Sequence, residues 1–489
     1  MYDIVVIGAG VSGCAIAREL SRYDASVLVV DREEDVCCGT SKANSAIVHA
    51  GFDAAEGSLM AQMNVRGNRM MDDLARDLDI PFKRNGAFVV CIDETQRDGL
   101  NALLARGEKN GVEGLRIVEK EELHRMEPNL SDDAVCALYA PSSGIICPFR
   151  LTIAMAECAA QNGVEFRFNI RVDALLRNAE GNWHLTTSTG PIVTRYVINA
   201  AGVYSADFHN RVSTKQLHIV PRRGDYCLLD REAGTHVSHT IFPQPTAMGK
   251  GILVTPTIHG NLMVGPTAID IDNLEATATT AEGIDTLIAG ASAYVKDLPI
   301  RKVITSFAGL RAHEDGHEFV LGEPEDAPHF IDCAGIESPG LTSAPAIGEY
   351  IGNLMKEKMS LREKSGWNGI RKDVLKPVGI DIEKRNALIK ENPAYGTIIC
   401  RCETISEGEI IDAIRRPLGA RSLDGIKRRT RAGMGRCQAG FCSPRVMEIL
   451  HRELDLPMDE ITKSGRQSVM VFGQTKAGGG VIRGRIMKS

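Results

Sequence analysis

Four cysteines late in the chain have the type and spacing of metal ligands. Cys400 and Cys402 form a C-x-C pair in "IICRCETI", and Cys437 and Cys442 form a C-x₄-C pair in "GRCQAGFCSPR". Four thiolates can hold one zinc ion, or they can hold the two irons of a [2Fe–2S] cluster. Zinc usually takes pairs spaced C-x₂₋₄-C. The C-x-C pair is cramped for a single tetrahedral ion, so the spacing favours the cluster over zinc.

Helix starts follow both cysteine pairs. Thr404 and Glu407 fit a T-x-x-E capping box directly after Cys402. "SPRVMEILHREL" follows Cys442 and places Pro444 in the first turn of another helix. We therefore predict that both pairs lie at helix N-termini, where positive dipole ends lower the pKa of thiols and stabilise an anionic cluster.

A glycine motif at the start of the chain predicts a nucleotide site. "DIVVIG" indicates a buried strand, and "SVLVVD" indicates a second strand that ends in Asp31. Between them, Gly8, Gly10 and Gly13 form G-x-G-x-x-G and open a segment with helical apolar spacing. Such glycines allow a tight turn, a close approach to a pyrophosphate and close helix packing, while the acid accepts hydrogen bonds from a ribose. The motif alone does not distinguish FAD from NAD.

The composition is that of an ordinary soluble protein. The chain has 489 residues, of which 43% are hydrophobic and 25% are charged, and this length allows about two to four domains. A net charge of −6 without a basic tail argues against a nucleic-acid partner. The longest apolar run, residues 4–17, is too short to cross a bilayer and lacks the basic start of a signal peptide. We therefore expect a cytoplasmic protein, in which disulfides are disfavoured.

Five motifs occur in an order that resembles a known family. They are "GAGVSG", "NSAIVHAG", "NAAG", "FAGLR" and "SPGLTSAPAIG". Residues 1–360 thus resemble the flavin-dependent family of D-amino-acid oxidase, glycine oxidase, glycerol-3-phosphate dehydrogenase and L-2-hydroxyglutarate oxidase. The resemblance implies an α/β fold, with a Rossmann-like FAD-binding domain and an antiparallel-sheet substrate domain. The cysteine segment resembles the small helical bacterioferritin-associated-ferredoxin-like domain, which holds a [2Fe–2S] cluster.

The resemblance also implies where the FAD-binding and substrate domains lie, and the charged stretch 356–377, which has few core positions, predicts a linker after them. The FAD-binding domain is expected to be discontinuous, and the substrate domain is expected to be inserted into it. The expected boundaries are 1–75, 146–214 and 306–360 for the FAD-binding domain, 76–145 and 215–305 for the substrate domain, 361–395 for a linker, 396–455 for the [2Fe–2S] domain and 456–489 for a C-terminal tail.

The family pattern implies a set of FAD contacts in this chain. They are Gly8, Gly10, Gly13, Asp31, Ser41, the backbone near Val172, Gly202, Gly340 and Leu341. The last two begin a predicted helix late in the chain. Their N–H groups would lie beside the electron-rich edge of the flavin ring, which gains negative charge on reduction, so a helix N-terminus there stabilises the reduced cofactor.

Arg311, in "FAGLR", is implied as the residue that binds the anionic group of the substrate. A guanidinium can hold a carboxylate or phosphate through two parallel hydrogen bonds. The alternative is a surface ion pair with Glu314 or Asp315. Arg66 and Lys250 are weaker candidates for contacts with the anion.

Two histidines are candidates for the proton acceptor. His49 lies in "IVHAG", where the family brings the chain past the flavin, and an imidazole there can take the hydroxyl proton of an alcohol. A structural role and a covalent attachment of the flavin are the alternatives for His49. His313 is the second candidate base.

The two ends of the chain point to different substrates. The cysteine tail is similar to that of anaerobic glycerol-3-phosphate dehydrogenase large subunits, which favours sn-glycerol 3-phosphate. Asp53 and Ala54 stand where aerobic glycerol-3-phosphate enzymes have an arginine and an aromatic residue, and this segment looks closer to the L-2-hydroxyglutarate pattern. An L-2-hydroxyacid, an amino acid or an imino acid therefore remains an alternative substrate, and a non-catalytic electron-transfer subunit is an alternative of another class.

The expected reaction is a dehydrogenation that feeds electrons onward. A second G-x-G-x-x-G unit after a strand is absent from the sequence, so we do not expect this chain to bind NAD. We expect the electrons to pass through the [2Fe–2S] cluster to a partner subunit or a quinone-linked protein, through which the enzyme could associate with a membrane.

Overall fold

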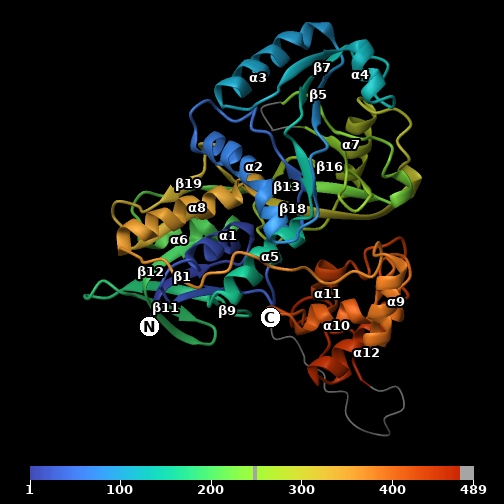
Figure 1. Cartoon of the computed structure of the whole chain (residues 1–489). Coiled ribbons are helices and arrows are strands. Elements are labelled where there is room, and N and C mark those ends of the chain that lie inside the picture. The colour runs from blue at the N-terminus through green and yellow to red at the C-terminus, as the bar shows by residue number, and fades with distance from the viewer. Residues whose placement is uncertain (246–250, 474–489) are drawn as a thin grey trace. The chain divides into compact units, whose positions relative to one another are not determined.

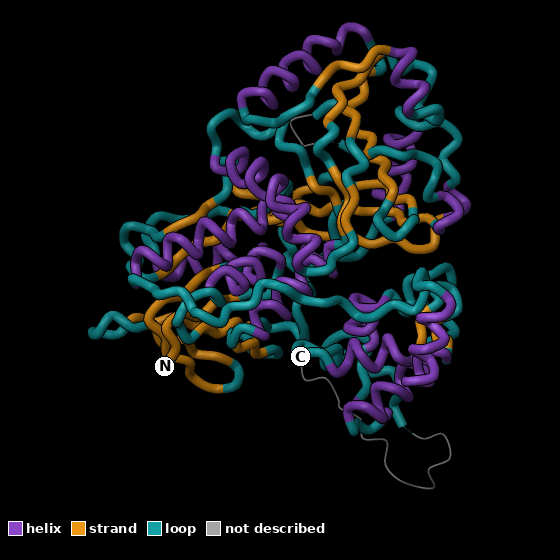
Figure 2. The backbone as a smooth tube through the Cα atoms, viewed as in Figure 1, coloured by secondary structure: helices purple, strands orange, loops and turns teal. Residues whose placement is uncertain are grey.

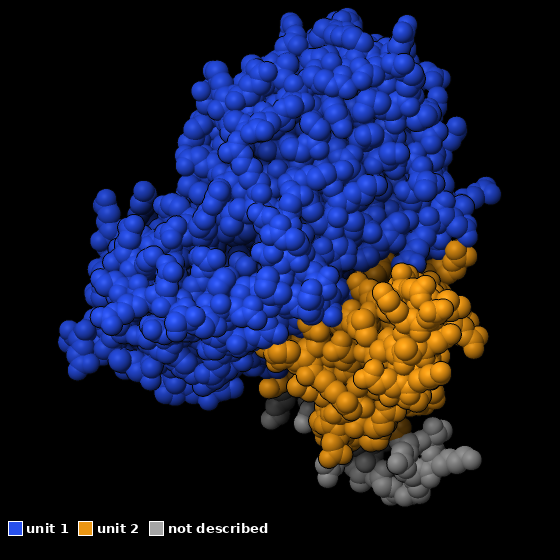
Figure 3. Space-filling model, viewed as in Figure 1, with its two compact units in different colours: residues 1–373 blue, residues 374–489 orange. Residues whose placement is uncertain are grey.

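The computed structural model describes residues 1–245 and 251–473 (Figure 1). The chain divides into two compact units, Met1–Asp373 and Val374–Ser489 (Figure 3). Among the described residues, no helix combines the length and the apolar composition needed to cross a bilayer. Each unit has its own core and is described in turn.

A mainly parallel sheet forms the first part of unit 1. Its strands are β1 (Tyr2–Ile7), β2 (Val27–Val30), β9 (Glu165–Arg167), β10 (Val172–Arg177), β11 (Trp183–Thr187), β12 (Gly190–Asn199), β19 (Val320–Gly322) and β20 (Phe330–Ala334). β1 is central and pairs in parallel with β2 and β12. All of β2 and the last four residues of β1 are buried, which explains their continuous β-branched sequences. The two strands predicted from the sequence are confirmed.

The helices of unit 1 are α1 (Val11–Leu20), α2 (Leu59–Asp77), α3 (Arg97–Lys109), α4 (Lys120–Met126), α5 (Pro148–Gln161), α6 (Ser205–Val212), α7 (Ala281–Ser292) and α8 (Gly340–Met359). α1 packs against α5 and α8, and α8 also packs against α2 (Figure 1). A Cβ atom on Gly67 of α2 would lie only 2.1 Å from the Thr342 carbonyl oxygen. Glycine at this position therefore allows α2 to lie directly on the first turn of α8.

A larger, mostly antiparallel sheet forms the second part of unit 1, seen as the other group of orange strands in Figure 2. Its strands are β5 (Ala87–Cys91), β6 (Arg116–Glu119), β7 (Cys136–Ala140), β13 (Ile219–Leu229), β14 (Thr240–Phe242), β15 (Leu253–Pro256), β16 (Leu262–Gly265), β17 (Ile269–Asp270) and β18 (Val303–Glu314). β18 pairs along the length of β13. The expected boundary at 306 is therefore misplaced, because residues 306–314 continue this sheet.

A small three-stranded sheet joins segments that are distant in sequence. It consists of β3 (Ile47–Val48), β4 (Phe82–Lys83) and β8 (Gly144–Ile146), with β8 between the other two. It places the chain before His49 beside Gly144, just ahead of α5.

The first part of the predicted linker, 361–395, is packed on unit 1. Arg371 is 2% exposed, and its Nε lies 2.7 Å from an oxygen of the fully buried Glu157 on α5. Arg371 Nη2 lies 3.1 Å from Asp373, which also pairs with Arg150. The charged composition that suggested a solvated linker is thus partly explained by buried ion pairs, which fasten the chain just before the unit boundary.

Unit 2 is a small helical unit. Its elements are α9 (Ile382–Glu391), α10 (Glu407–Arg415), α11 (Leu423–Thr430), α12 (Ser443–Leu454) and the two short strands β21 (Ile398–Cys400) and β22 (Ile405–Ser406). Its core includes Val374 and Ile461, both outside the expected 396–455 boundaries. The start of the predicted tail therefore belongs to this unit, since Ile461 is fully buried.

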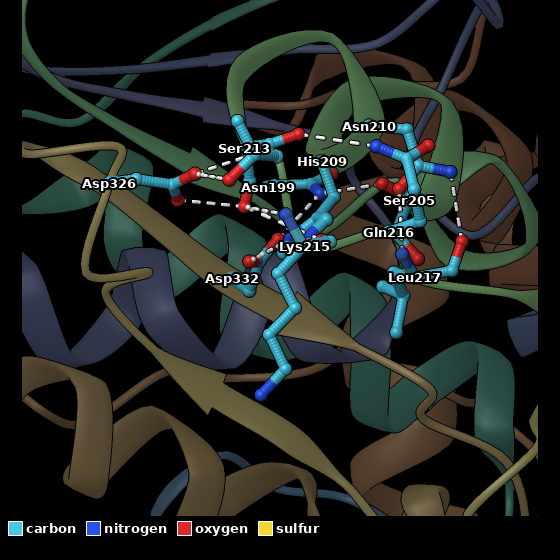
Figure 4. Close-up of polar contacts among 11 residues, drawn as sticks. Asn199, Ser205, His209, Asn210, Ser213, Lys215, Gln216, Leu217, Asp326 and Asp332 are labelled. Atoms are coloured by element: carbon cyan, nitrogen blue, oxygen red, sulfur yellow. Dashed lines mark hydrogen bonds and ion pairs between the residues drawn. The ribbon is translucent and has the colours of Figure 1, made fainter.

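A buried polar network supports the end of β12 (Figure 4). His209 Nδ1 lies 2.7 Å from Asp332 Oδ2, and its Nε2 lies 2.6 Å from the Lys215 carbonyl oxygen. The Asn199 amide donates to Asp332 Oδ1 and to the Ser205 carbonyl oxygen, both at 2.9 Å. The network thus connects α6, β12 and β20 beneath the turn that follows β12.

We expect His209→Ala to lower the free energy of unfolding of unit 1 by about 3–5 kcal/mol, because it leaves the carboxylate of Asp332 buried without its ionic partner. The hydrogen bond to Asp332 raises the pKa of His209. The ion pair therefore stabilises the folded unit fully below about pH 6.5, which is the pKa of a histidine in the unfolded chain. This stabilisation is lost as the pH rises through the pKa of His209 in the folded protein. Denaturant unfolding from pH 6 to 9 should show the difference between wild type and variant shrinking.

The matched control is His218→Ala. His218 pairs with Asp315 at 2.9 Å, but its side chain is 70% exposed. We expect this change to alter stability by less than about 0.5 kcal/mol. Equal losses in the two variants would show that the buried pair adds nothing specific.

Candidate active site and metal centre

The glycine motif forms a tight turn between β1 and α1. Gly8 has φ +107°, and a Cβ atom there would lie 2.4 Å from the Ala200 carbonyl oxygen. A Cβ atom on Gly13 would lie 2.0 Å from the Gly8 carbonyl oxygen, so the helix rests on its own entry turn. Gly10 is the N-cap residue of α1, with no side chain to cover the N-terminus. The turn therefore leaves a helix N-terminus suited to a pyrophosphate.

Asp31 is held at this turn by backbone N–H groups. Its Oδ2 accepts from the Ala9 N–H at 2.7 Å, and its Oδ1 accepts from the Glu33 N–H at 2.9 Å. The Ile170 N–H donates to the Asp31 carbonyl oxygen at 2.9 Å. The chain then enters β10 at Val172, which shares a hydrophobic cluster with Val30. Asp31 and Val172 thus lie at the same edge of the sheet.

Gly202 lies at the neighbouring carboxyl end, that of β12. It has φ +60° and begins a short 3₁₀ turn, Gly202–Tyr204. The Ala200 N–H donates to the Ile7 carbonyl oxygen at 2.9 Å, which holds this turn beside the end of β1. Ligands of open parallel sheets bind at such carboxyl ends. The structure thus brings Gly8, Asp31, Val172 and Gly202 to one edge.

The loop that follows residue 39 contacts both the start of α1 and β18 of the second sheet. Ser41 Oγ accepts from the Val11 N–H at 2.8 Å, at the start of α1. Thr40 Oγ1 donates to the Leu310 carbonyl oxygen of β18 at 2.5 Å. A Cβ atom on Gly309 would lie 2.1 Å from the Ala43 carbonyl oxygen. This loop therefore holds the larger, mostly antiparallel sheet against the glycine turn between β1 and α1.

His49 is anchored through its backbone between α2 and α8. Its N–H donates to Thr342 Oγ1 at 2.9 Å, in the first turn of α8. Its carbonyl oxygen accepts from the side-chain amides of Asn64 and Asn68 at 2.9 and 2.8 Å. Its ring lies 5.8 Å from that of Phe242 in β14. His49 therefore lies beside the helix start formed by Gly340 and Leu341.

Arg311 lies on β18 opposite Arg222 of β13. Its Nη2 donates to the Thr267 carbonyl oxygen at 2.7 Å and its Nε to the Arg222 carbonyl oxygen at 3.4 Å. Burial lowers the pKa of Arg311, although nearby Tyr226 and Glu337 oppose the shift. Among the described residues, no carboxylate forms a direct ion pair with this guanidinium, and its hydrogen bonds go to carbonyl oxygens.

The alternative of a surface ion pair for Arg311 does not occur within the described ranges 1–245 and 251–473. Glu314 Oε2 accepts from the Gly316 N–H at 2.8 Å, and Asp315 pairs with His218. Arg222, by contrast, forms a bidentate pair with Asp270 at 2.6 and 2.9 Å. Of these two cross-strand arginines, Arg311 is the better candidate for an incoming anion.

His313 lies two residues after Arg311, on the same face of β18, while Leu310 and Ala312 are buried on the other. The His313 Nδ1 lies 2.7 Å from Glu337 Oε1. An ionised carboxylate only accepts hydrogen bonds, so it holds the proton of His313 on Nδ1 and leaves Nε2 with a lone pair. His313 is thereby oriented as a base.

Reasoning from the sequence missed three residues of this site. Glu337 and His317, which also contacts Glu337 Oε1 at 2.8 Å, are brought to His313 by the turn after β18 and the loop before α8. Tyr226 stacks on Phe307 with ring centroids 4.7 Å apart. The only signal in the sequence was the alternation of residues in "RRGDYCLLD", which places Tyr226 and Arg222 on one face of a strand.

Arg66, one of the two weaker anion candidates, does not join Arg311. Arg66 forms a bidentate pair with Glu349 at 2.8 and 2.9 Å, and its side chain is 54% exposed. The prediction that Arg66 contacts the substrate is therefore not supported by its position. Lys250 lies outside the described residues.

The four predicted cysteine ligands converge in unit 2. The sulfurs of Cys402 and Cys437 are 3.5 Å apart, and Cys400 is hydrogen-bonded to Cys442. The hydrogen bond from Cys442 lowers the pKa of Cys400 to about 6, and backbone N–H groups of Gly433 and Glu403 add to this effect. Each close pair contains one cysteine from each sequence motif.

This paired arrangement fits two irons better than one zinc. Four thiolates on a single tetrahedral zinc would all lie about 3.8 Å from one another. Within the described part of the chain, no three of these sulfurs lie mutually within 4.8 Å. Two pairs of thiolates are what a [2Fe–2S] cluster requires.

The helix starts beside the cysteines are confirmed, with one correction. The capping box consists of Ser406 and Glu409, not Thr404 and Glu407. Thr404 has φ +56°, because the chain turns there after Cys402, whereas Ser406 has the extended backbone typical of a capping-box N-cap residue. Cys442 is itself the N-cap residue of α12.

The fold and the two sites together define a flavoprotein oxidoreductase with an iron–sulfur centre. Residues 3–354 match the family described as FAD dependent oxidoreductase, and residues 398–452 match the BFD-like [2Fe-2S] binding domain. The chain belongs to the FAD dependent oxidoreductase family, and its cofactors are FAD and a [2Fe–2S] cluster. The expected family, fold class and cofactors are confirmed.

Three relatives show how far the likeness extends. The chain is 47% identical over 479 residues to a protein named glycerol 3-phosphate dehydrogenase of Caloramator mitchellensis, covering 98% of this chain and 99% of the relative. It is 30% identical to a glycerol 3-phosphate oxidase of Mycoplasma pneumoniae, covering 75% and 97%. The solved structure of reduced L-alpha-glycerophosphate oxidase from M. pneumoniae with FAD bound superposes with a TM-score of 0.72 at 30% identity, covering 76% of this chain and 98% of that one.

Proposed function

We propose that this enzyme is an FAD-dependent dehydrogenase that oxidises sn-glycerol 3-phosphate to dihydroxyacetone phosphate. The observation that carries the proposal is the pair formed by Arg311 and His313 on one face of β18. Arg311 offers an anion site without a direct carboxylate partner in the described ranges, and His313 is oriented by Glu337 as a base. The name of the relative that matches nearly the whole chain supports the choice of substrate.

The residues of the site have two separate roles, substrate binding and proton removal. Arg311 binds the phosphate through two hydrogen bonds and so places the carbon chain over the site. His313 accepts the hydroxyl proton at Nε2, while Glu337 holds Nδ1. When bound, the flavin takes up the hydrogen from carbon with its two electrons, and the cluster carries electrons onward singly. Gly340 and Leu341 would present the N–H groups at the start of α8 to the flavin. The residues that would hold the rest of the dinucleotide are Gly8, Gly10, Gly13, Asp31, Ser41, Val172 and Gly202.

The substrate is tested by anaerobic bleaching of the bound flavin. We expect glycerol 3-phosphate to bleach it at a concentration at which L-2-hydroxyglutarate and amino acids do not, because the relative that matches nearly the whole chain is named a glycerol 3-phosphate dehydrogenase. Faster bleaching by L-2-hydroxyglutarate would select the L-2-hydroxyacid alternative. If none of these compounds bleaches the flavin, the chain is an electron-transfer subunit.

The two histidines are separated by matched substitutions. We expect His313→Asn to slow flavin bleaching at pH 7 by about 10²–10³-fold, since a positioned base typically contributes 10²–10⁴-fold. We expect His49→Asn to slow bleaching by less than about tenfold, because the ring of His49 packs on Phe242 while its backbone makes the anchoring contacts to α2 and α8. The reverse order of effects would assign the proton to His49.

We further propose that the electrons leave through Cys400, Cys402, Cys437 and Cys442 to a partner subunit or a quinone-linked protein in the cytoplasm. The convergence of these thiols supports the cluster as the exit. We expect cell extract to reduce a quinone. This activity should be lost when antibodies remove this chain from the extract, and it should return when the purified protein is added.

A further inference from the structure

One carboxylate oxygen in the loop before α8 contacts two imidazoles. Glu337 Oε1 lies 2.7 Å from His313 Nδ1 and 2.8 Å from His317 Nδ1. The two imidazole centroids are 5.7 Å apart. A proton gained by one ring therefore changes the electrostatic environment of the other through the carboxylate that they share.

The three side chains lead from the site to solvent. The side chain of His313 is 16% exposed and that of Glu337 is 6% exposed, whereas that of His317 is 63% exposed. His313 lies on the face of β18 that carries Arg311, and His317 lies in the turn that follows this strand. Only the outer histidine can exchange protons freely with water.

The surrounding charges limit how much positive charge Glu337 can balance. Burial raises the pKa of Glu337, but the hydrogen bonds from His317 and His313 outweigh burial and lower it. The hydrogen bond to Glu337 raises the pKa of His317, with help from Asp53. Two guanidiniums, Arg222 and Arg311, also interact with the charge of Glu337, and Asp270 is engaged with Arg222 while facing His313. A single carboxylate beside two guanidiniums is a poor partner for two imidazolium ions at once.

We propose that Glu337 stabilises one imidazolium at a time, so that a proton arriving on His313 from the substrate hydroxyl expels a proton from His317 to water. The inference rests on the proposed alcohol oxidation. The substrate O–H bond breaks and an N–H bond forms at Nε2 of His313, while the Nε2–H bond of His317 breaks and its proton goes to solvent. The hydrogen on carbon and its electron pair leave to the flavin. The three side chains therefore keep the same net charge, and proton release keeps pace with substrate oxidation.

A divalent cation is the competing interpretation of the same cluster. The ligand atoms of His313, His317 and Glu337 all lie within 4.8 Å of one another. Two histidines and a carboxylate can bind zinc. The charge of Arg311, which has no direct carboxylate partner within the described ranges, disfavours a cation at this place, so proton release is the better use of the three groups.

The experiment is an anaerobic single turnover of the full-length holoenzyme with glycerol 3-phosphate in weakly buffered solution containing a pH indicator. In the wild type we expect one proton to appear in step with flavin bleaching. In His317→Gln we expect bleaching to persist and the proton to appear at least about fivefold later, with the lag removed by added imidazole buffer. His218→Gln is the matched control, because His218 is another exposed histidine paired with a carboxylate, Asp315, and it should behave as wild type.

The pH profile supplies a second readout. The bleaching rate should fall at low pH, where His313 is protonated, and we call this fall the acid limb. His317→Gln removes the competing imidazolium, so the acid limb should move to higher pH. Glu337→Gln removes the shared anion, so the same limb should move to lower pH. A purely structural role would not move the limb in opposite directions.

The outcomes separate this inference from the proposed function. Bleaching by glycerol 3-phosphate with proton release still in step in His317→Gln would overturn the inference and leave the proposed function standing. Stoichiometric divalent metal in purified wild type, lost in His317→Gln, would also overturn it in favour of a metal site. No bleaching of the wild type would contradict the proposed function and this inference together.

Discussion

Replacing Arg311 with methionine should lower the second-order rate of flavin bleaching by glycerol 3-phosphate by about 10²–10³-fold. A hydrogen bond to a charged group contributes about 1.5–3 kcal/mol, and the guanidinium can make two to a phosphate. Two such bonds amount to about 3–6 kcal/mol, and the lower part of this range corresponds to about 10²–10³-fold, because each 1.36 kcal/mol is a factor of ten. Stopped-flow bleaching across substrate concentrations measures the change. The FAD content should stay at the wild-type value, since Arg311 donates its hydrogen bonds to the carbonyl oxygens of Arg222 and Thr267, which are not among the expected FAD contacts.

Arg311→Lys and Arg66→Met complete this test. Lysine keeps the charge but not the planar pair of donors, so we expect it to restore only part of the rate. Arg66 is bound to Glu349 on the surface, and its loss should change the rate by less than about twofold. A full rate in Arg311→Met would show that another group holds the phosphate.

Replacing Cys402 with serine should abolish the iron–sulfur cluster and leave substrate oxidation by the flavin intact. We expect iron and acid-labile sulfide to fall from about two each per chain to near zero in anaerobically purified protein. The cluster needs both members of the Cys402–Cys437 pair, whose sulfurs are 3.5 Å apart. Flavin bleaching should stay within about twofold of wild type, whereas the electron paramagnetic resonance signal of the reduced cluster should disappear.

Cys136→Ala is the control for this prediction. Cys136 is fully buried in β7 of unit 1, so its loss should not change the iron content. Zinc in place of iron in the wild type would contradict the cluster. Loss of flavin bleaching in Cys402→Ser would show that the cluster is needed for substrate oxidation itself.

The parts of the fold that could be predicted from the sequence are the parts that depend on neighbouring residues. The turn at Gly8 and the carboxylate of Asp31 belong to one strand–turn–helix–strand unit, in which each residue has a local steric or hydrogen-bonding reason. The cysteine pairs could be recognised for the same reason, because the members of each pair are close together in the sequence.

Local patterns failed where two overlapping capping-box patterns were possible, or where strands distant in the sequence paired. Thr404 and Ser406 both begin a capping-box pattern, and the turn after Cys402 decides for Ser406. β18 carries apolar residues that suit either sheet, and its pairing with β13 decides for the second. The charged segment before residue 373 is held by Arg371 and its buried partner Glu157, which no local pattern reveals.

The sequence by itself determined the family, the two cofactors and the identity of Arg311 and the four cysteines as candidates, because these depend on residue type and on short spacings along the chain. Only the tertiary structure decided which groups meet. It pairs Cys402 with Cys437 across the two motifs, and it brings Glu337 from the loop before α8 to His313 on β18. The physical reason is that such contacts are set by strand pairing and helix packing over long separations, so the role of each histidine depends on a partner that its own stretch of sequence does not contain.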